Sequence, residues 1–233
     1  MGIITDFALN HAKSRKVVLP QEYYGELQGL SRALAFSVSG IALIAVLEFV
    51  RDSLAESISK GQSFTDWKQA VVSGKIKLQL SETHKLTVFR TAMAVSYNRG
   101  RCAEQRKTRF DFPYLEYSAI NDSKTRDEHR RMDGFIAAYD DPIWFLWRPP
   151  NGFNCRCILI KRTKRQYEAL IKADPSLTQK PIGILPDAGF AYDPCGDIYG
   201  VFDGLLNQSK KGFFDRIVDK IKSGFDKLKS LLQ

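Results

Sequence analysis

The spacing of the apolar residues changes in the middle of this chain, and that change limits the folds it can adopt. Two stretches, Leu30–Lys60 and Ser81–Arg106, carry apolar side chains at the i, i+3, i+4 spacing of a helix that buries one face. From Tyr114 to Ile120 the apolar residues alternate instead, and Cys155–Ile160 is short, apolar and β-prone, so both are predicted strands. We therefore predict an α+β fold, with a helical N-terminal layer packed on a small β-sheet.

Capping signals place two further helices. Gly61 has the position of a helix C-terminal stop, and Ser63 followed by Asp66 resembles an N-cap pair, which predicts a short helix that ends at Gly74. Thr163–Ala173 is predicted as another helix, with Thr163 as its cap, and Ser81 is a candidate N-cap of the helix predicted over Ser81–Arg106.

The chain is predicted to have a main domain with two appendages. Residues 1–29 are expected to form an N-terminal arm or a peripheral element of the core, with a short helix that starts at Pro20, and residues 30–200 the main domain. Within that domain, Pro175–Gly200 contains several prolines and glycines and is predicted to be an extended segment on the surface. Residues 201–233 are predicted to be a linker followed by an amphipathic helix.

The C-terminal helix has the clearest apolar periodicity in the chain. Its apolar face is formed by Phe214, Ile217, Val218, Ile221, Phe225, Leu228 and Leu232. This face could pack on its own domain or on symmetry-related copies, dock in a groove of a partner protein, or lie in a membrane interface. Aspartates interleaved with the lysines of the polar face count mildly against the membrane alternative.

Net charge and cysteine content place only loose limits on the function. Lys and Arg number 35 against 26 Asp and Glu, and the resulting charge of +9 favours an anionic partner or simply a solvated basic surface. No secretory signal opens the chain, so we expect cytosolic synthesis and reduced thiols at Cys102, Cys155, Cys157 and Cys195. The longest uncharged stretch, Ala33–Leu47, is too short to span a bilayer and is predicted to be a buried helix.

The densest polar chemistry lies in three segments between Asn121 and Cys157. They read D-x-x-T-R-x-x-H-x-x-x-D-G, D-D-P-x-W and P-P-N-G-F-x-C-R-C. Their defining residues are Asp122, Thr125, Arg126, His129, Asp133, Gly134, Asp141, Pro142, Trp144, Pro149, Pro150, Asn151, Gly152, Cys155, Arg156 and Cys157.

In these segments the chain resembles the phage Mu F-like family of head morphogenesis proteins, also called minor head or minor capsid proteins. Weaker flanking matches extend the resemblance from about Leu19 to Gly196 and include G-F-A-Y-D-P at Gly189–Pro194. There the chain departs slightly from the family pattern, since Cys195 intervenes before Gly196. The amphipathic tail from Leu205 onward has no family match.

The resemblance implies a structural role in head morphogenesis. The expected location is the phage head, with assembly in the host bacterial cytoplasm. The expected partners are the portal protein, the major capsid protein or both. Packaged double-stranded DNA is a further partner that the basic charge would suit. A first alternative is a metal-dependent nuclease or a toxin-like domain, and a second is a membrane-active DNA-ejection protein that uses the C-terminal helix.

Catalysis and metal binding are both less favoured than a purely structural role for the motif segments. His129, Cys155 and Cys157 could together ligate zinc, with Asp122, Asp133 or water in the fourth position. The competing interpretation is a hydrogen-bonded core, in which Arg126 pairs with Asp122 or Asp133 and the cysteines act as small apolar residues. Trp144 and Trp147, with Phe145 and Phe153, are expected to form a local core under the loop rather than a ligand stack. Because no spacing matches a nuclease motif, we expect no enzyme activity and no cofactor, with zinc left open.

Overall fold

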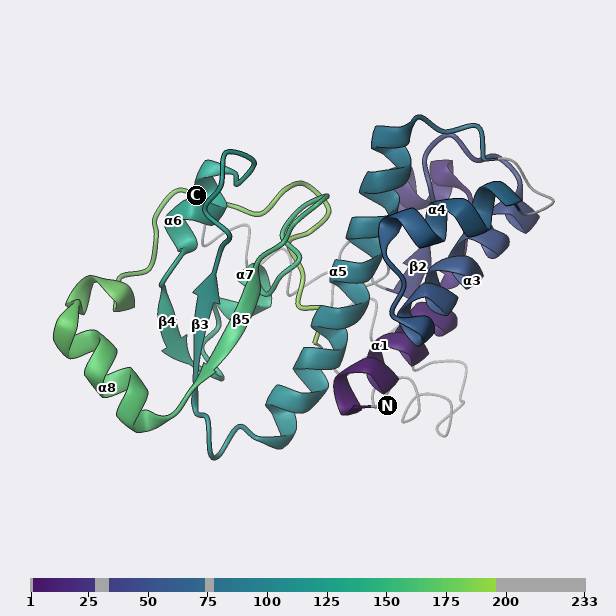
Figure 1. Cartoon of the computed structure of the whole chain (residues 1–233). Coiled ribbons are helices and arrows are strands. Elements are labelled where there is room, and N and C mark those ends of the chain that lie inside the picture. The colour runs from purple at the N-terminus through teal and green to yellow at the C-terminus, as the bar shows by residue number, and fades with distance from the viewer. Residues whose placement is uncertain (1, 28–33, 74–77, 196–233) are drawn as a thin grey trace, which may run out of the picture. The chain divides into compact units, whose positions relative to one another are not determined.

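The computed structural model of the chain describes residues 2–27, 34–73 and 78–195, and it confirms the α+β prediction (Figure 1). The predicted C-terminal helix and its apolar face lie outside the described residues, as does the predicted helix end at Gly74. Within the described residues, no helix has both the length and the apolar character needed to cross a membrane.

The N-terminal half is a layer of helices around a shared apolar core. It contains α1 (Ile3–Ser14), α3 (Ile44–Lys60), α4 (Phe64–Ser73) and α5 (Glu82–Lys107). The core side chains include Leu47, Val50, Leu54, Trp67, Val71 and Phe89, which supports the predicted helical spacing. Burial of this stripe is what holds the helices together, because none of them would be stable in isolation.

The predicted caps are present. Gly61 ends α3 in the left-handed conformation, with φ of 62°. Before α4, the Ser63 backbone N–H and hydroxyl donate to the Asp66 carboxylate, and the Asp66 N–H donates back to the Ser63 hydroxyl. Ser81 caps α5 by accepting a hydrogen bond from the His84 N–H.

The prediction of a helix through Leu30–Lys60 is wrong for residues 35–43, and residues 30–33 lie outside the described residues. Residues Ala35–Phe36 form strand β2, which pairs in parallel with β1 (Lys16–Val17), and α3 begins only at Ile44. Gly40 has φ of 83° and allows the chain to turn between them. The uncharged run could not reveal the strand, because its hydrogen-bond partners lie in a distant segment.

Within residues 2–27, α1 packs directly into this layer. Ala8 and Ala12 of α1 are buried in one cluster with Ala55 and Ile58 of α3. The short helix expected after Pro20 is a single π-helical turn, Glu22–Glu26. The expected peripheral element is therefore packed on the core rather than extended from it.

The second half is built on an antiparallel sheet in the order β4-β3-β5. Its strands are β4 (Ile136–Ala138), β3 (Tyr114–Ser118) and β5 (Ile158–Arg162). Leu115 and Tyr117 of β3 are fully buried, which confirms the predicted alternation. The second strand begins later than predicted, at Ile158, and β4 was not predicted.

Helices and a closing segment (residues 179–195) surround this sheet (Figure 1). α8 (Lys164–Ala173) begins with the predicted Thr163 cap and is followed by a 3-10 turn, Pro175–Thr178. Tyr167 of α8 stacks on Tyr114 of β3, with ring centroids 3.8 Å apart. Beyond that turn the chain is irregular as far as Cys195, as expected for this segment, although Ile184 and Phe190 are buried.

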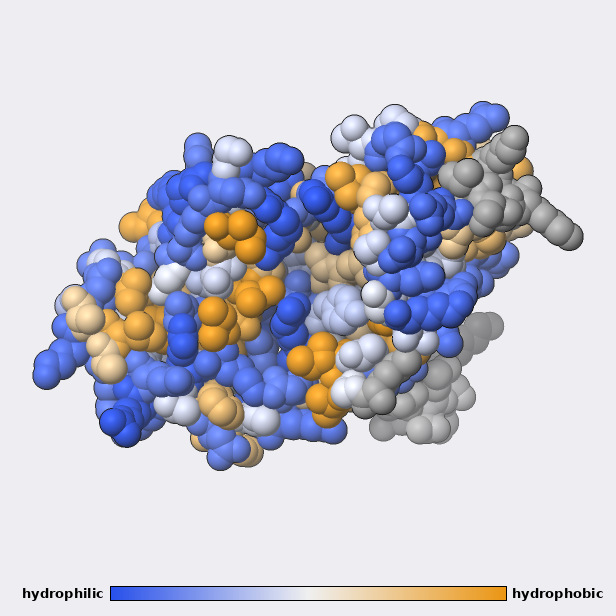
Figure 2. All heavy atoms as spheres, viewed as in Figure 1, coloured by the Kyte–Doolittle hydropathy of each residue, from blue (hydrophilic) through white to orange (hydrophobic). Residues whose placement is uncertain are grey.

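Two short helices carry parts of the motif segments. They are α6 (Asp127–Met132) and α7 (Trp144–Trp147). Both tryptophans of α7 are buried in the core of this half, as predicted. Phe145 and Phe153, which were expected to join them, are exposed, because a one-turn helix and a tight turn direct them outward. On the face shown in Figure 2, apolar residues form separate islands within a mostly hydrophilic surface.

Candidate functional site

The structure brings the motif segments together into one bonded unit, here called the motif cluster (residues 121–134, 140–145 and 148–157, which include Phe145 next to the second segment). The Asp122 carboxylate accepts hydrogen bonds from both terminal nitrogens of Arg156, each at 2.6 Å. It also accepts from the Lys124 N–H and the Thr125 hydroxyl. The bond with Arg156 is the main reason that the pKa of Asp122 lies well below its ordinary value.

Asp133 bonds the end of the first segment to the backbone just after β3. Its carboxylate accepts hydrogen bonds from the Ala119 N–H at 2.7 Å and from the Asn121 side-chain amide at 2.5 Å. Gly134 follows with φ of 76°, which a residue with a side chain rarely adopts, and its N–H bonds the carbonyl of Tyr117. Asp133 and Gly134 therefore fix the turn that leads from α6 into β4.

Asp141 organises the second segment in a similar way. It accepts a hydrogen bond from the Ile143 N–H and forms an ion pair with Lys180 at 2.9 Å. Pro142 follows Asp141 at the start of the turn into α7, and the Trp144 indole N–H donates to the carbonyl of Ala138. The segment is thus anchored to the end of β4.

Asn151 lies at the centre of the third segment and is completely buried. Its side-chain oxygen accepts a hydrogen bond from the Tyr117 hydroxyl at 3.0 Å, and its amide donates to the carbonyl of Arg148. Burial raises the pKa of Tyr117, which keeps the hydroxyl protonated as the donor. The preceding Pro149–Pro150 peptide bond is cis.

Arg126 does not pair with Asp122 or Asp133, so that prediction is wrong. It forms an ion pair with Asp187 of the closing segment at 3.0 Å and donates to the carbonyl of Phe153. Asp187 can approach this closely because Gly152 has no side chain: a Cβ there would collide with the Asp187 carboxylate. Of the two expected partners, Asp122 is bonded to Arg156, and Asp133 accepts hydrogen bonds from Ala119 and Asn121.

The motif cluster is also bonded to α5. Asn154 adopts φ of 58°, and its backbone N–H and side-chain amide donate to the hydroxyls of Thr91 and Thr87, respectively. Asparagine tolerates this left-handed conformation better than most residues. The third segment is therefore fixed both to the sheet and to the long helix.

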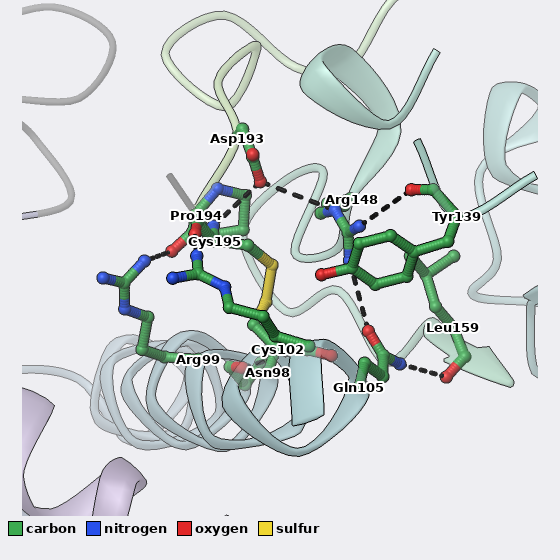
Figure 3. Close-up of a disulfide and its surroundings, with 12 residues drawn as sticks. Asn98, Arg99, Cys102, Gln105, Tyr139, Arg148, Leu159, Asp193, Pro194 and Cys195 are labelled. Atoms are coloured by element: carbon green, nitrogen blue, oxygen red, sulfur yellow. Dashed lines mark hydrogen bonds and ion pairs between the residues drawn. A yellow bond between two sulfur atoms is a disulfide. The ribbon is translucent and has the colours of Figure 1, made fainter. Parts of the chain in front are cut away.

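A disulfide between Cys102 of α5 and Cys195 joins the closing segment to the long helix (Figure 3). The expectation of reduced thiols is wrong for this pair. Reasoning from the compartment of synthesis could not show that the chain returns to α5 after 93 residues, with the two Cα atoms 5.4 Å apart. Cys155 and Cys157 are free and buried.

Polar contacts reinforce this closure (Figure 3). Arg99 donates to the carbonyl of Pro194, and Arg148 forms an ion pair with Asp193 at 3.6 Å. Arg148 also donates to the side chain of Gln105, whose amide bonds the carbonyl of Leu159. Burial raises the pKa of Asp193 and lowers that of Arg148, so each charge depends on the other for its stability.

His129, Cys155 and Cys157 meet beneath the surface of the motif cluster. The Nδ1 atom of His129 lies 3.4 Å from the Cys157 sulfur and 3.8 Å from the Cys155 sulfur. The potential ligand atoms of these buried residues all lie within 4.8 Å of one another. No carboxylate belongs to this group among the described residues. Asp122 and Asp133, the acidic alternatives for a fourth ligand, are therefore absent from it.

The two thiols influence each other strongly. A hydrogen bond with Cys157, together with His129, holds the pKa of Cys155 well below its ordinary value. The same hydrogen bond and burial raise the pKa of Cys157. The pair therefore favours a state in which one thiolate is stabilised by its protonated neighbour.

Residues 48–160, which contain all the motif segments, match the family model described as Phage Mu protein F like protein. Over these residues the chain is similar to the Mu F-like family. The putative capsid assembly protein F of Escherichia phage Mu is 32% identical over 146 residues, which cover 54% of this chain and 33% of that protein. The Mu-like prophage FluMu F protein of Haemophilus influenzae is 31% identical over 150 residues, or 58% of this chain and 36% of that protein.

The chain thus spans about a third of the length of these curated relatives. No solved structure matches it. The matched Mu F-like residues end at the middle of β5, so the closing segment with Asp187, Asp193 and Cys195 lies beyond them.

A groove beside the Mu F-like motifs was not predicted from the sequence. It has a volume of about 410 Å³ and is lined by α5 and by the first and third segments. Arg90, Lys124, Arg126 and Arg156 all contribute to its wall, and none of the described residues that line it is acidic. These cations are scattered over 67 residues of sequence from Arg90 to Arg156, so no local charge run indicated them.

Proposed function

We propose that this chain acts in the assembly of a phage head, as a minor head protein that docks on the portal protein or on the inner capsid. The similarity to a putative capsid assembly protein supports the general role. The observation that carries the docking role is the motif cluster itself. The Asp122–Arg156 pair cross-links its first and third segments, and the Tyr117–Asn151 hydrogen bond fixes the third segment to β3, as expected for a rigid surface rather than a moving one.

The chemistry of the motif cluster supports a structural role. A hydrolytic site needs a nucleophile and a base, or paired carboxylates of tuned pKa, in a reachable position. The carboxylates of Asp122 and Asp133 are engaged in hydrogen bonds that fix the fold, and His129 is buried. A nuclease assay on the purified protein and on the His129→Ala variant tests the alternative: cleavage that disappears in the variant would establish an enzyme.

Exposed apolar residues on the motif cluster indicate where a protein partner could bind. Phe145, 65% exposed, and Phe153, 41% exposed, belong to it, whereas Phe110, 83% exposed, lies outside it. Large exposed apolar side chains are preferred contacts in protein interfaces. Phe110 therefore provides a matched control for the two phenylalanines of the cluster.

Co-expression with the portal and major capsid proteins of the same phage, followed by affinity purification, tests the proposal. We expect the chain to co-purify with one of them, with the yield reduced by Phe145→Ser and unchanged by Phe110→Ser. Wild-type protein that co-purifies with neither head protein would contradict the assembly role. Equal yields for both variants would place the docking surface elsewhere.

The basic groove supports a second contact, with the phosphates of packaged DNA. Phosphate contacts by Lys and Arg dominate affinity for DNA and make it depend on salt. We expect Arg90→Glu with Lys124→Glu to weaken DNA binding and to flatten its salt dependence by roughly 0.9 per lost phosphate contact. Lys164→Glu with Arg165→Glu on α8 removes the same charge outside the groove. Equal effects of the two double variants would show only a general charge effect.

A further inference from the structure

The arrangement of His129, Cys155 and Cys157 matches the spacing of ligands around a tetrahedral metal ion. With zinc bonds of about 2.3 Å to sulfur and 2.0–2.1 Å to nitrogen, tetrahedral N and S ligands lie about 3.6 Å apart. The two observed Nδ1–sulfur distances, 3.4 and 3.8 Å, fall on either side of that value. Two thiols and an imidazole are also ligands that zinc favours, whereas Mg²⁺ and Ca²⁺ prefer oxygen ligands.

We propose that His129 Nδ1, Cys155 Sγ and Cys157 Sγ bind one zinc ion, whose fourth position is open to a small cavity. The ion would bond α6 of the first motif segment to the Cys155–Cys157 turn of the third. It would thus join two segments that are already held at the surface by Asp122 and Arg156.

The surroundings of the three side chains leave room for a fourth ligand. A cavity of about 10 Å³ is lined by all three of them, together with Thr125, Arg126 and Arg156. That volume is close to the minimum that holds one water molecule. Since the nearby carboxylates are occupied, water is the fourth ligand that the cavity fits. Three protein ligands with one open position is an arrangement that zinc adopts in proteins.

Local charge and backbone geometry favour the metal-bound form. Arg126 and Arg156 line the same cavity and would stabilise thiolates, which are the form of cysteine that binds metal. The Cys155 N–H bonds the carbonyl of Gly152, which fixes the turn before the first sulfur ligand. The ligand positions are therefore set by the backbone and are not left to flexible side chains.

The imidazole is held on its other side by an aromatic ring. His129 lies edge-to-face with Trp147, with ring centroids 6.2 Å apart. None of the described residues hydrogen-bonds its Nε2 atom, which is buried. Because Nδ1 lies close to both sulfurs and Nε2 has no hydrogen-bond partner among the described residues, the orientation of His129 is explained better by a metal at Nδ1 than by a hydrogen-bond network.

Elemental analysis of the full-length protein, purified without added metal or chelator, tests this proposal directly. We expect about one zinc per chain in the wild type and a loss of more than about tenfold in His129→Asn and Cys157→Ser. Cys102→Ser is the matched control, because it removes a sulfur from the same protein without touching the cluster, and it should retain the metal.

Two measurements on the wild type keep the test independent of how the variants fold. After cobalt replaces the native metal, thiolate-to-cobalt absorption in the near ultraviolet is expected. Alkylation mapped by mass spectrometry should spare Cys155 and Cys157 until a chelator is added. A folded wild type that binds neither zinc nor cobalt, or whose Cys155 and Cys157 alkylate equally with and without chelator, would overturn the proposal. So would stoichiometric binding of a different metal in place of zinc.

Discussion

The carboxylate of Asp122 and the guanidinium of Arg156 form two parallel hydrogen bonds of 2.6 Å each, across 34 residues of sequence. This pair joins the first and third motif segments, and Arg156 lines the same small cavity as His129, Cys155 and Cys157. The two segments thereby form one bonded unit. Because the pair requires the charged form of Asp122, its contribution to stability can be tested by changing the pH.

The stability supplied by Asp122 should depend on pH in a defined direction. Because its pKa in the folded chain is below the ordinary value of 3.8, its contribution is fully present above pH 3.8 and is lost as the pH falls through the folded pKa. We expect Asp122→Asn to lower the free energy of unfolding by a constant amount near neutral pH. Denaturant titrations at a series of pH values should show the difference from wild type narrowing below 3.8.

A variant at the neighbouring exposed residue, Ser123→Ala, is the control for that profile. It should follow the wild type at every pH. If the difference in unfolding free energy between wild type and Asp122→Asn stayed the same from neutral pH to well below pH 3.8, the Asp122–Arg156 pair would not be its source.

The buried hydrogen bond between Tyr117 and Asn151 should show strong coupling. Asn151→Ala removes the acceptor and leaves a buried hydroxyl unsatisfied, which costs about 1–3 kcal/mol. Adding Tyr117→Phe should recover part of that loss, because the unpaired hydroxyl is then gone. A double-mutant cycle of unfolding free energies measures this, and strictly additive losses would contradict it.

Gly100 of α5 should not tolerate alanine. A Cβ at this position would collide with the carbonyl oxygen of Ile4 in α1, so α1 would have to move away. Overpacking of this kind costs about 1–3 kcal/mol and opposes the better helix propensity of alanine. Thermal unfolding and hydrogen exchange of the α1 amides measure the effect. Gly25→Ala, where a Cβ meets open space, serves as the control and should change neither quantity.

Reduction of the Cys102–Cys195 disulfide should destabilise the chain, because it reopens a loop that the bond closes across 93 residues. The loss of chain-entropy restraint corresponds to as much as about 4–5 kcal/mol. The Tm of the wild type should fall on addition of a reductant to the value of Cys102→Ser. The variant should not respond to the reductant, which also controls for effects at the other two thiols. Equal responses of both proteins would assign the change to Cys155 and Cys157 instead.

Local sequence signals determined the elements whose cause is local. The caps at Ser63, Ser81 and Thr163, the left-handed stop at Gly61 and the alternation in β3 could all be predicted, because each depends on residues within a few positions. The polar motif segments could also be found, since their residue types are dense and ordered along the chain.

Only the tertiary structure decided what those residues contact. Arg126 pairs with Asp187 and not with a nearby aspartate, β2 interrupts a predicted helix, and Cys102 meets Cys195. Each depends on a partner far along the chain, and residue spacing carries no information on which distant segments fold together. The same physical reason applies to His129, Cys155 and Cys157: the sequence supplied the ligand types, and the packing of α6 against the third segment supplied their distances.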